Sequence, residues 1–185
     1  MRSVTYVHPG EQLRCQGCHE PKHEARVRSN AVPLALRRPP SKIAPGPEGS
    51  NPFSYVRLVQ PVLDRHCVRC HQGRDAMDLR GVIEGPYGWT RSYTKLAGRY
   101  GFYFHASKGC MPRKVTGGSR TVPGAFGARA AKLMKYVDER HYDVKLPPDA
   151  RRRITTWLDC NSEFYGAYDQ TQAQARGDVV QPALD

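Results

Sequence analysis

The sequence lacks long apolar runs, has few acidic residues and is only moderately hydrophobic. No stretch approaches the about 18–20 consecutive apolar residues of a membrane-spanning helix, so we expect no membrane span. Hydrophobic residues make up 39% of the 185 residues, and 29 lysines and arginines outnumber 17 aspartates and glutamates. The resulting formal charge of +12 favours an acidic partner protein. No nucleic-acid-binding motif accompanies this charge, so we expect no nucleic-acid partner.

What the chain has instead is a repeated pentapeptide, Cys-x-x-Cys-His. It occurs as Cys15-Gln16-Gly17-Cys18-His19 and as Cys67-Val68-Arg69-Cys70-His71. This is the attachment signature of c-type haem. Two cysteines three positions apart reach both vinyl groups of one porphyrin from a single helical turn, and the adjacent histidine supplies an axial nitrogen to the iron. We therefore predict two haem c groups, attached through these cysteines and ligated on their proximal sides by His19 and His71.

A zinc site built from the same four cysteines is the alternative for this pattern. Structural zinc sites usually join two cysteine pairs separated by about 12–20 residues, and Cys18 and Cys67 are much farther apart. Such a site also gives no reason for a histidine after each pair. The pattern therefore favours haem, whereas a zinc-bound interaction module would be colourless.

Covalent haem attachment takes place outside the cytoplasm, so we expect a periplasmic or otherwise extracytoplasmic protein. Because no signal peptide precedes the first motif, we expect the chain to be a processed product or a piece of a larger polypeptide. Two further cysteines, Cys110 and Cys160, fit a disulfide in an oxidising compartment. Buried free thiols or haem ligation are the alternatives for them.

Composition divides the chain into three parts. Residues 1–52 carry the first haem motif and a connector that is rich in proline and poor in apolar periodicity. Residues 53–168 carry the second motif and form a cytochrome c-like domain. Residues 169–185 are polar and rich in glutamine, which predicts a disordered tail. The fold class that we expect is mainly α with long irregular loops, a c-type cytochrome whose helices pack around two covalent haems.

Apolar periodicity predicts four helices from residue 51 onward. The first begins with Asn51 as N-cap and runs into the second haem motif, with a kink or break at Pro61. A short helix is expected over 92–97 and a long amphipathic helix over 127–141. The last helix opens at Pro147-Pro148-Asp149. Its inward residues are Ala150, Ile154, Trp157 and Leu158.

Each haem iron of an electron carrier needs a sixth ligand, usually His or Met, on the face opposite the proximal histidine. His141 ends the apolar face of the helix predicted over 127–141 and is far enough along the chain to fold back over the second haem. His105 is the next candidate for either haem. His23 lies four positions after His19, where a continuing helix would bring it to the same side of the ring, although a proline interrupts that helix. His23 and His105 therefore stay open as ligands of the first haem.

Several runs outside the pentapeptides resemble those of a known family. They are Leu58-Val59-Gln60-Pro61-Val62-Leu63-Asp64-Arg65-His66-Cys67, His141-Tyr142-Asp143-Val144-Lys145-Leu146, Thr156-Trp157-Leu158-Asp159-Cys160-Asn161 and Tyr165-Gly166. Together with Cys15-Gln16-Gly17-Cys18-His19-Glu20-Pro21, they make the chain similar to planctomycete multihaem cytochromes and to the C-terminal dihaem domain of the hydrazine synthase alpha subunit. The resemblance covers nearly the whole chain up to Tyr168.

This resemblance implies a dihaem domain at the C-terminal end of a longer exported protein. It implies that the second haem is an electron-transfer centre with two histidine ligands, here His71 and His141. In that family a tyrosine four residues after the histidine of the first motif binds the catalytic first haem. This chain has His23 at that position. The difference argues against assigning the hydrazine chemistry of that family to this chain.

The function that we expect is electron transfer by a dihaem c-type cytochrome, either as a free module or as a domain of a larger redox protein. The alternative is a haem enzyme of hydrazine synthase-like or peroxidase-like type, in which one iron has an open position. The sixth ligand of the first haem separates the two, because only an open or weakly ligated iron would bind added carbon monoxide or cyanide.

The purified protein is expected to show Soret absorbance, and its mass should exceed that of the bare polypeptide by two haems when a host that matures c-type cytochromes produces it. Replacing Cys67 and Cys70 together by alanine should remove one of the two haems, because both thioether bonds of that group are lost. Cys160→Ala is the control and should leave both in place. A colourless wild-type protein would contradict the haem prediction.

Overall fold

The computed structural model describes residues 9–10, 32, 34–103, 116–117, 120–138 and 141–183. The chain forms two compact units, residues 1–43 and residues 44–185. The segment that follows residue 43 binds to the second unit. Glu48 forms an ion pair with Arg57 at 2.9 Å, and the carbonyl of Pro52 accepts a hydrogen bond from the same guanidinium at 2.8 Å.

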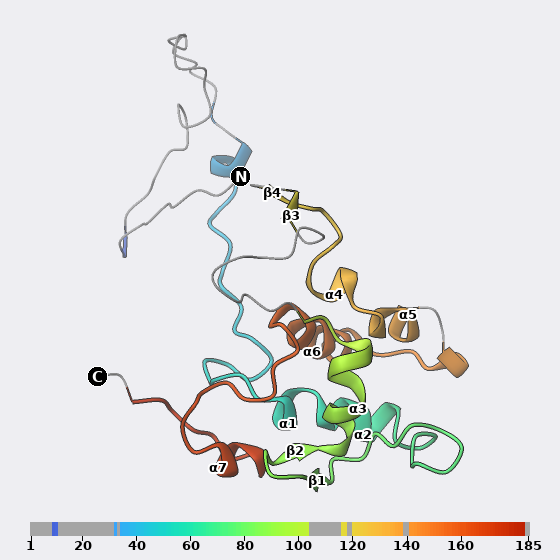
Figure 1. Ribbon diagram of the computed structural model, residues 1–185. Coiled ribbons are helices and arrows are strands. Elements are labelled where there is room, and N and C mark those ends of the chain that lie inside the picture. Colours follow the sequence, from blue (N-terminus) through green and yellow to red (C-terminus); the bar gives the residue numbers. More distant parts are fainter. Residues whose placement is uncertain are drawn as a thin grey trace. The chain divides into compact units, whose positions relative to one another are not determined.

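In the first unit the described element is a 3-10 helix, η1 (Leu34–Arg37) (Figure 1). Two local hydrogen bonds are described in and beside it. Arg37 Nε donates to the carbonyl of Val32 at 3.1 Å, and Arg38 donates to Ser41 Oγ at 2.6 Å. The first haem motif belongs to this unit and lies outside the described residues.

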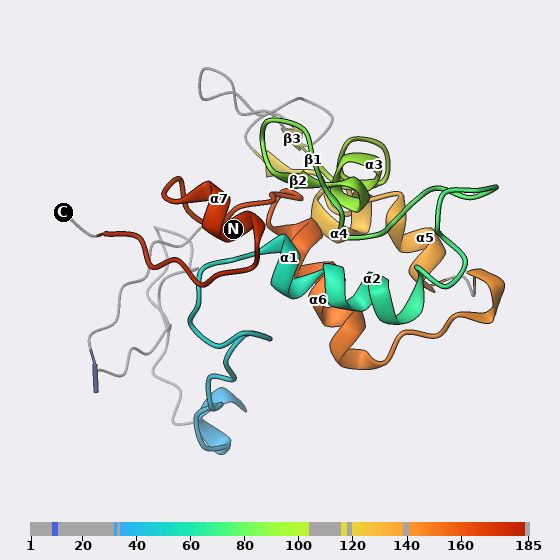
Figure 2. The same ribbon diagram turned by 90° about the horizontal axis from the view of Figure 1, so that it is seen from below.

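The described helices of the second unit are short, and none is long and apolar enough to cross a bilayer. The first two are α1 (Tyr55–Leu58) and α2 (Gln60–His66), which are separated by a break at Val59 (Figures 1 and 2). The break predicted at Pro61 is confirmed. Pro61 occupies the first turn of α2, where its missing N–H removes no helical hydrogen bond.

Hydroxyl side chains cap two of the helices. Ser54, and not Asn51 as predicted, is the N-cap of α1, because its Oγ accepts a hydrogen bond from the amide of Arg57 at 3.3 Å. Thr90 caps α3 (Arg91–Tyr100), its Oγ1 accepting a hydrogen bond from the amide three residues further on at 3.3 Å. The helix predicted over 92–97 is thus confirmed, and it extends beyond both predicted ends.

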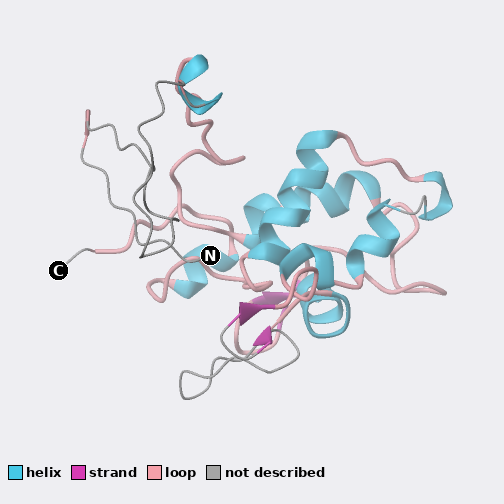
Figure 3. Cartoon of the chain, turned by 90° about the horizontal axis from the view of Figure 1, so that it is seen from above, coloured by secondary structure: helices cyan, strands magenta, loops and turns pink. Residues whose placement is uncertain are grey.

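Strand occurs, in the part of the chain that the structure describes, as two short antiparallel hairpins (Figure 3). β1 (Ile83–Glu84) pairs with β2 (Trp89–Thr90), with Ile83 opposite Thr90. β3 (Thr116–Gly117) pairs with β4 (Arg120–Thr121). Because β2 leads directly into α3, the first hairpin determines where α3 begins.

The helix predicted over 127–141 is replaced by α4 (Gly127–Ala130), α5 (Leu133–Asp138) and the 3-10 turn η3 (His141–Asp143). The prediction of one continuous helix is wrong, because Ala131 has an extended backbone conformation (φ −74°, ψ 129°). Ala131 and Leu133 are both buried. On a straight helix two such positions face directions about 200° apart, so the break lets both side chains reach the core.

α6 (Pro148–Asp159) packs against α1, α2 and α4 and closes the core (Figure 2). The four residues that were predicted to face inward are all buried, which confirms the prediction: Ala150, Ile154, Trp157 and Leu158. Trp157 meets the ring of Tyr55 edge-on, with centroids 5.1 Å apart, and Tyr55 stacks on Phe164 at 5.4 Å. Aromatic pairs in these geometries add stability beyond the area that they bury.

The C-terminal segment differs from the disordered tail that was predicted over 169–185. It contains α7 (Thr171–Ala175) and three buried side chains, Gln174, Ala175 and Val180. Gln174 accounts for this order. Its Nε2 donates to the carbonyls of Ala167 and Asp169 at 2.9 and 2.6 Å, and its Oε1 accepts from the amide of Gly166 at 3.1 Å. A polar side chain thus pins a segment whose composition predicted disorder.

Leu158→Ala should lower the free energy of unfolding by about 2–5 kcal/mol, because Leu158 is fully buried and its loss leaves a cavity. Val179→Ala is the matched control. Val179 is 50% exposed, so its replacement should change stability by less than about 0.5 kcal/mol. Denaturant unfolding measures both, and equal effects would contradict the position of α6 in the core.

Candidate haem-ligand site

The second haem motif starts where α2 ends. Cys67 is the C-cap of that helix, and its amide donates to the carbonyl of Leu63 at 2.8 Å. The chain then turns tightly, since the amides of Cys70 and His71 both donate to the carbonyl of Cys67, at 3.1 and 3.0 Å. Cys67 is half-buried and Cys70 is exposed. One turn therefore carries both thiols and the histidine of the pentapeptide.

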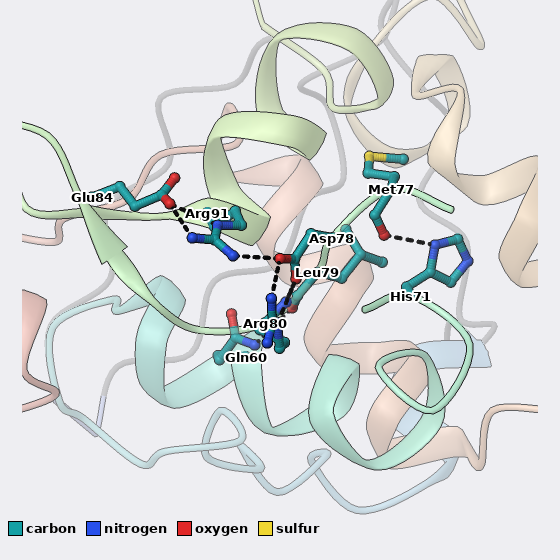
Figure 4. A network of polar contacts seen from close by, with 8 residues as sticks. All are labelled: Gln60, His71, Met77, Asp78, Leu79, Arg80, Glu84 and Arg91. Carbon is teal, nitrogen blue, oxygen red and sulfur yellow. Dashed lines mark hydrogen bonds and ion pairs between the residues drawn. The ribbon is translucent and has the colours of Figure 1, made fainter. Parts of the chain in front are cut away.

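Backbone groups on two sides fix the position of His71 (Figure 4). Its carbonyl accepts a hydrogen bond from the amide of Leu79 at 3.0 Å, and its ring Nδ1 lies 3.0 Å from the carbonyl oxygen of Met77. A carbonyl oxygen only accepts hydrogen bonds, so Nδ1 carries the proton of the neutral ring. The lone pair is therefore on Nε2, which leaves that nitrogen as the one suited to bind a metal.

His141 lies beside His71, although the two residues are far apart in the sequence. Their ring centroids are 5.9 Å apart and their planes are inclined by 31°. Two imidazoles bonded at about 2.0–2.1 Å to opposite sides of one metal ion have centroids about 6.3–6.5 Å apart, slightly more than the separation here. The turn after α2 and the η3 segment come together at one end of the helical unit (Figures 1 and 2). The separation of the two rings thus suits an iron held between them.

Aromatic rings surround His141. Tyr136 and Tyr142 meet it edge-on, with centroids 5.3 and 4.8 Å away, and Tyr136 in turn contacts Tyr100 of α3 at 5.6 Å. Tyr142 has a left-handed backbone conformation (φ 46°, ψ 42°), and 87% of it is exposed. This conformation costs of order 1 kcal/mol for a residue other than glycine. The contacts of η3 with α5 and with the neighbouring rings hold it in place.

The cysteines of the motif do not converge with the two histidines. Within the described ranges, no three His, Cys, Asp or Glu side chains are grouped closely enough to hold a metal ion. A structural zinc ion needs four protein ligands, whereas a porphyrin supplies four nitrogens and takes two ligands from the protein. A pair of imidazoles therefore suits haem iron better than zinc. The pKa of the Cys67 thiol is raised to about 11, mainly by burial and to a smaller extent by the neighbouring Cys70 thiol.

A charged network lies next to the His71 loop (Figure 4). Asp78 binds the guanidinium groups of Arg80 at 2.7 Å and of Arg91 at 2.5 Å, and Arg91 also forms an ion pair with Glu84. The hydrogen bond from Arg80, followed by that from Arg91, holds the pKa of Asp78 well below its usual value despite burial. The hydrogen bond from Arg91 likewise lowers the pKa of Glu84. Asp78 is therefore an anion fixed between two cations.

Several predicted site residues lie outside the described part of the chain. They are Cys15, Cys18, His19, His23, His105 and Cys110. The first haem site therefore stays a prediction, and so does the disulfide between Cys110 and Cys160. Cys160 is exposed at the C-terminal cap of α6, and partial burial raises the pKa of its thiol.

Two features of the site have no predictive pattern in the sequence, the Met77 carbonyl and the pair of Asp78 with Arg91. A backbone carbonyl leaves no mark on a sequence, because every residue has one. Asp78 and Arg91 are 13 positions apart, which is no helical or strand spacing. Gly73 is the one local signal of the sharp loop. Its φ is +87°, and a Cβ there would lie 3.0 Å from the Cβ of Asp78.

Asp78→Asn is expected to lower the free energy of unfolding at pH 7, because asparagine loses the charged pairs with Arg80 and Arg91. The folded-state pKa of Asp78 lies below its unfolded value of about 3.9. Its stabilising contribution is therefore complete above that value and is lost as the pH falls through the folded-state pKa.

The difference in stability between wild type and Asp78→Asn should therefore shrink between about pH 5 and about pH 2, as measured by urea unfolding. Asp178→Asn is the control. Asp178 forms an exposed pair with Arg176 at 3.4 Å, so its replacement should matter little at any pH. A difference for Asp78→Asn that stays constant across this range would contradict the ionised network.

The residues of the candidate site are two thiols on the turn after α2, two neighbouring imidazoles and one orienting carbonyl. They belong to Cys67, Cys70, His71, His141 and Met77. No protein-family model, curated protein or solved structure matches this chain, so its own residues carry the functional interpretation.

Proposed function

We propose that the protein is a dihaem c-type cytochrome that transfers electrons. Cys67 and Cys70 would hold the second haem through thioether bonds, and His71 and His141 would ligate its iron. The first haem is held by Cys15 and Cys18, with His19 as its proximal ligand and His23 or His105 as its sixth ligand.

The observation that carries this proposal is the pairing of the two imidazoles. The ring centroids of His71 and His141 are 5.9 Å apart, and the hydrogen bond of the His71 Nδ1 to Met77 leaves Nε2 for a metal. Two histidine nitrogens complete the coordination that the four porphyrin nitrogens begin. An iron with both axial positions filled suits one-electron transfer better than substrate binding.

The haem supplies the one-electron chemistry at iron, and the protein supplies attachment and orientation. Cys67 and Cys70 attach the group at the end of α2. That helix is anchored in the core by Val62 and Leu63, which are both buried. The attachment point is therefore part of the rigid helical unit.

Two contacts hold the ligating rings in place. The Met77 carbonyl keeps the proton on the Nδ1 of His71, so the neutral ring has one tautomer and one orientation. On the other side, the ring of Tyr136 packs edge-on against His141 at 5.3 Å and limits its rotation. The His71 ring thus presents the lone pair of Nε2, and ring packing restrains His141 beside it.

The surface beside the second motif favours an acidic redox partner. Three arginines in or beside the motif are exposed: Arg65, Arg69 and Arg74. The exposed acidic residues there are Asp64 and Asp75, so positive charge is in excess. Such a surface attracts an acidic protein and speeds its association, an effect that weakens with salt. We propose an extracytoplasmic electron-transfer role, as a free module or within a larger polypeptide.

His141→Ala tests the proposal. The variant should keep both haems by mass, because the thioether bonds are intact, while one of the two haems changes from low spin to high spin. Visible and electron paramagnetic resonance spectra measure the change. His66→Ala is the matched control. His66 is half-buried and directly precedes Cys67, so it cannot reach the opposite side of the ring, and its replacement should leave the spectra unchanged.

Three outcomes would contradict parts of this proposal. A wild-type protein without covalent haem would refute it as a whole. An unchanged low-spin spectrum in His141→Ala would refute the role of His141 and favour His105. Carbon monoxide binding by the reduced wild-type protein would identify an open iron, and it would favour the haem enzyme over the electron carrier.

A further inference from the structure

We infer that Asp78, Arg91 and Gln60 hold the Met77 carbonyl against His71 and thereby set the reduction potential of the second haem. They are positioning residues, since they act on the iron ligand through the loop backbone. This role rests on the proposed function, because His71 is the proximal ligand there. It concerns the potential and not haem attachment, so the two can fail separately.

The Met77 carbonyl belongs to a closed loop, residues 71–79. The amide of Leu79 donates to the carbonyl of His71 at 3.0 Å and joins the two ends of the loop. Because a peptide unit is planar, the direction of the Met77 carbonyl follows from the position of the residue after it. That residue, Asp78, and its neighbour Leu79 are both buried. Each is bound to a different helix.

Asp78 ties the loop to α3. Arg91, the first residue of α3, donates to the Asp78 carboxylate at 2.5 Å and pairs with Glu84 of β1 through its other amino group. Its guanidinium thus bridges two carboxylates (Figure 4). The Asp78 side chain is 9% exposed and that of Arg91 is 27% exposed, so water competes little for this pair. Arg80 also binds Asp78, and its carbonyl accepts a hydrogen bond from the amide of Ser92 at 3.3 Å, so the same segment is held to α3 at a second point.

Gln60 ties the next residue to α2. Its Nε2 donates to the carbonyl of Leu79 at 3.1 Å and to Asp64 at 2.8 Å, while its Oε1 accepts a hydrogen bond from Ser92. Ser92 in turn accepts a hydrogen bond from the hydroxyl of Tyr55 at 3.1 Å. Gln60 is 5% exposed, and a buried amide without its partners is costly. The loop is therefore fastened to the core at two successive residues.

The strength of the hydrogen bond on Nδ1 influences how strongly His71 donates electrons through Nε2. A firm hydrogen bond to a carbonyl makes the imidazole more basic. A more basic ligand stabilises ferric iron relative to ferrous iron, which lowers the reduction potential. Loosening the clamp on the Met77 carbonyl should therefore raise the potential of the second haem and leave its attachment unchanged.

Arg91→Lys tests this role without changing the net charge. A lysine ammonium cannot hold Asp78 and Glu84 in the fork that a guanidinium offers. We expect the potential of the second haem to rise, with both haems attached and low spin. Arg176→Lys is the matched control. It alters the exposed pair of Arg176 with Asp178 and should leave the potential unchanged.

Potentiometric titration of the dihaem protein gives both potentials, and the second haem is the one whose potential His141→Ala shifts. Gln60→Met is an independent second variant of similar length. It carries no donor for the Leu79 carbonyl and should shift the potential in the same direction, even if Arg91→Lys folds poorly.

A rise in either variant, with Arg176→Lys unchanged, supports the positioning role. Wild-type potentials in both variants, measured on protein with two low-spin haems, would overturn it and leave the proposed function standing. Wild-type protein that lacks haem on Cys67 and Cys70 would overturn the proposed function, and the positioning role with it.

Discussion

A single hydrogen bond, from the ring Nδ1 of His71 to the carbonyl of Met77 at 3.0 Å, determines what the proposed site can do. It selects one tautomer and fixes the ring, so the other nitrogen has a lone pair and a direction. The other contacts of the loop hold this hydrogen bond in place. It closes on the His71 carbonyl through Leu79 and turns sharply at Gly73, whose φ is +87°. Without the loop, the histidine of the pentapeptide would be an ordinary surface imidazole.

The loop has one defined conformation because its hydrogen bonds continue the hydrogen-bond network of the core. Tyr55 is fully buried, and burial raises the pKa of its hydroxyl, which therefore stays a donor. That hydroxyl bonds to Ser92, which bonds to Gln60, which bonds to the backbone of the loop. Within the described chain no buried side-chain nitrogen or oxygen lacks a hydrogen-bond partner. A satisfied network of this kind specifies one arrangement, because any other leaves a buried polar group unpaired.

The two proposed iron ligands are held in different ways. His71 follows α2 and is fixed by backbone hydrogen bonds on both sides of its loop. His141 sits in a 3-10 turn, where its carbonyl accepts a hydrogen bond from the amide of Val144 at 3.0 Å and tyrosine rings pack against its side chain. Packing fixes a ring less strictly than directional hydrogen bonds do. Whether His141 stays on the iron would therefore distinguish electron transfer from ligand binding at the second haem.

The amino-acid sequence by itself determined those features that depend on residues close together in the chain. The Cys67–His71 turn, the break at Pro61 and the inward face of α6 are of this kind, because helical spacing and proline geometry act over a few residues. Local patterns failed where distant contacts decide the backbone. The extended conformation at Ala131 and the order around Gln174 both arise from burial against other segments.

Only the tertiary structure brought the two halves of the site together. Apolar periodicity marked His141 as a candidate, but a helical pattern cannot say which other residue a side chain will meet. The 5.9 Å separation from His71 depends on how α5 and η3 pack beside the end of α2. The clamp of Arg91 on Asp78 and the choice of the Met77 carbonyl have no pattern in the sequence at all. They result from folding, because the buried residues Asp78 and Leu79 have to find partners for a charge and a backbone carbonyl on the neighbouring helices.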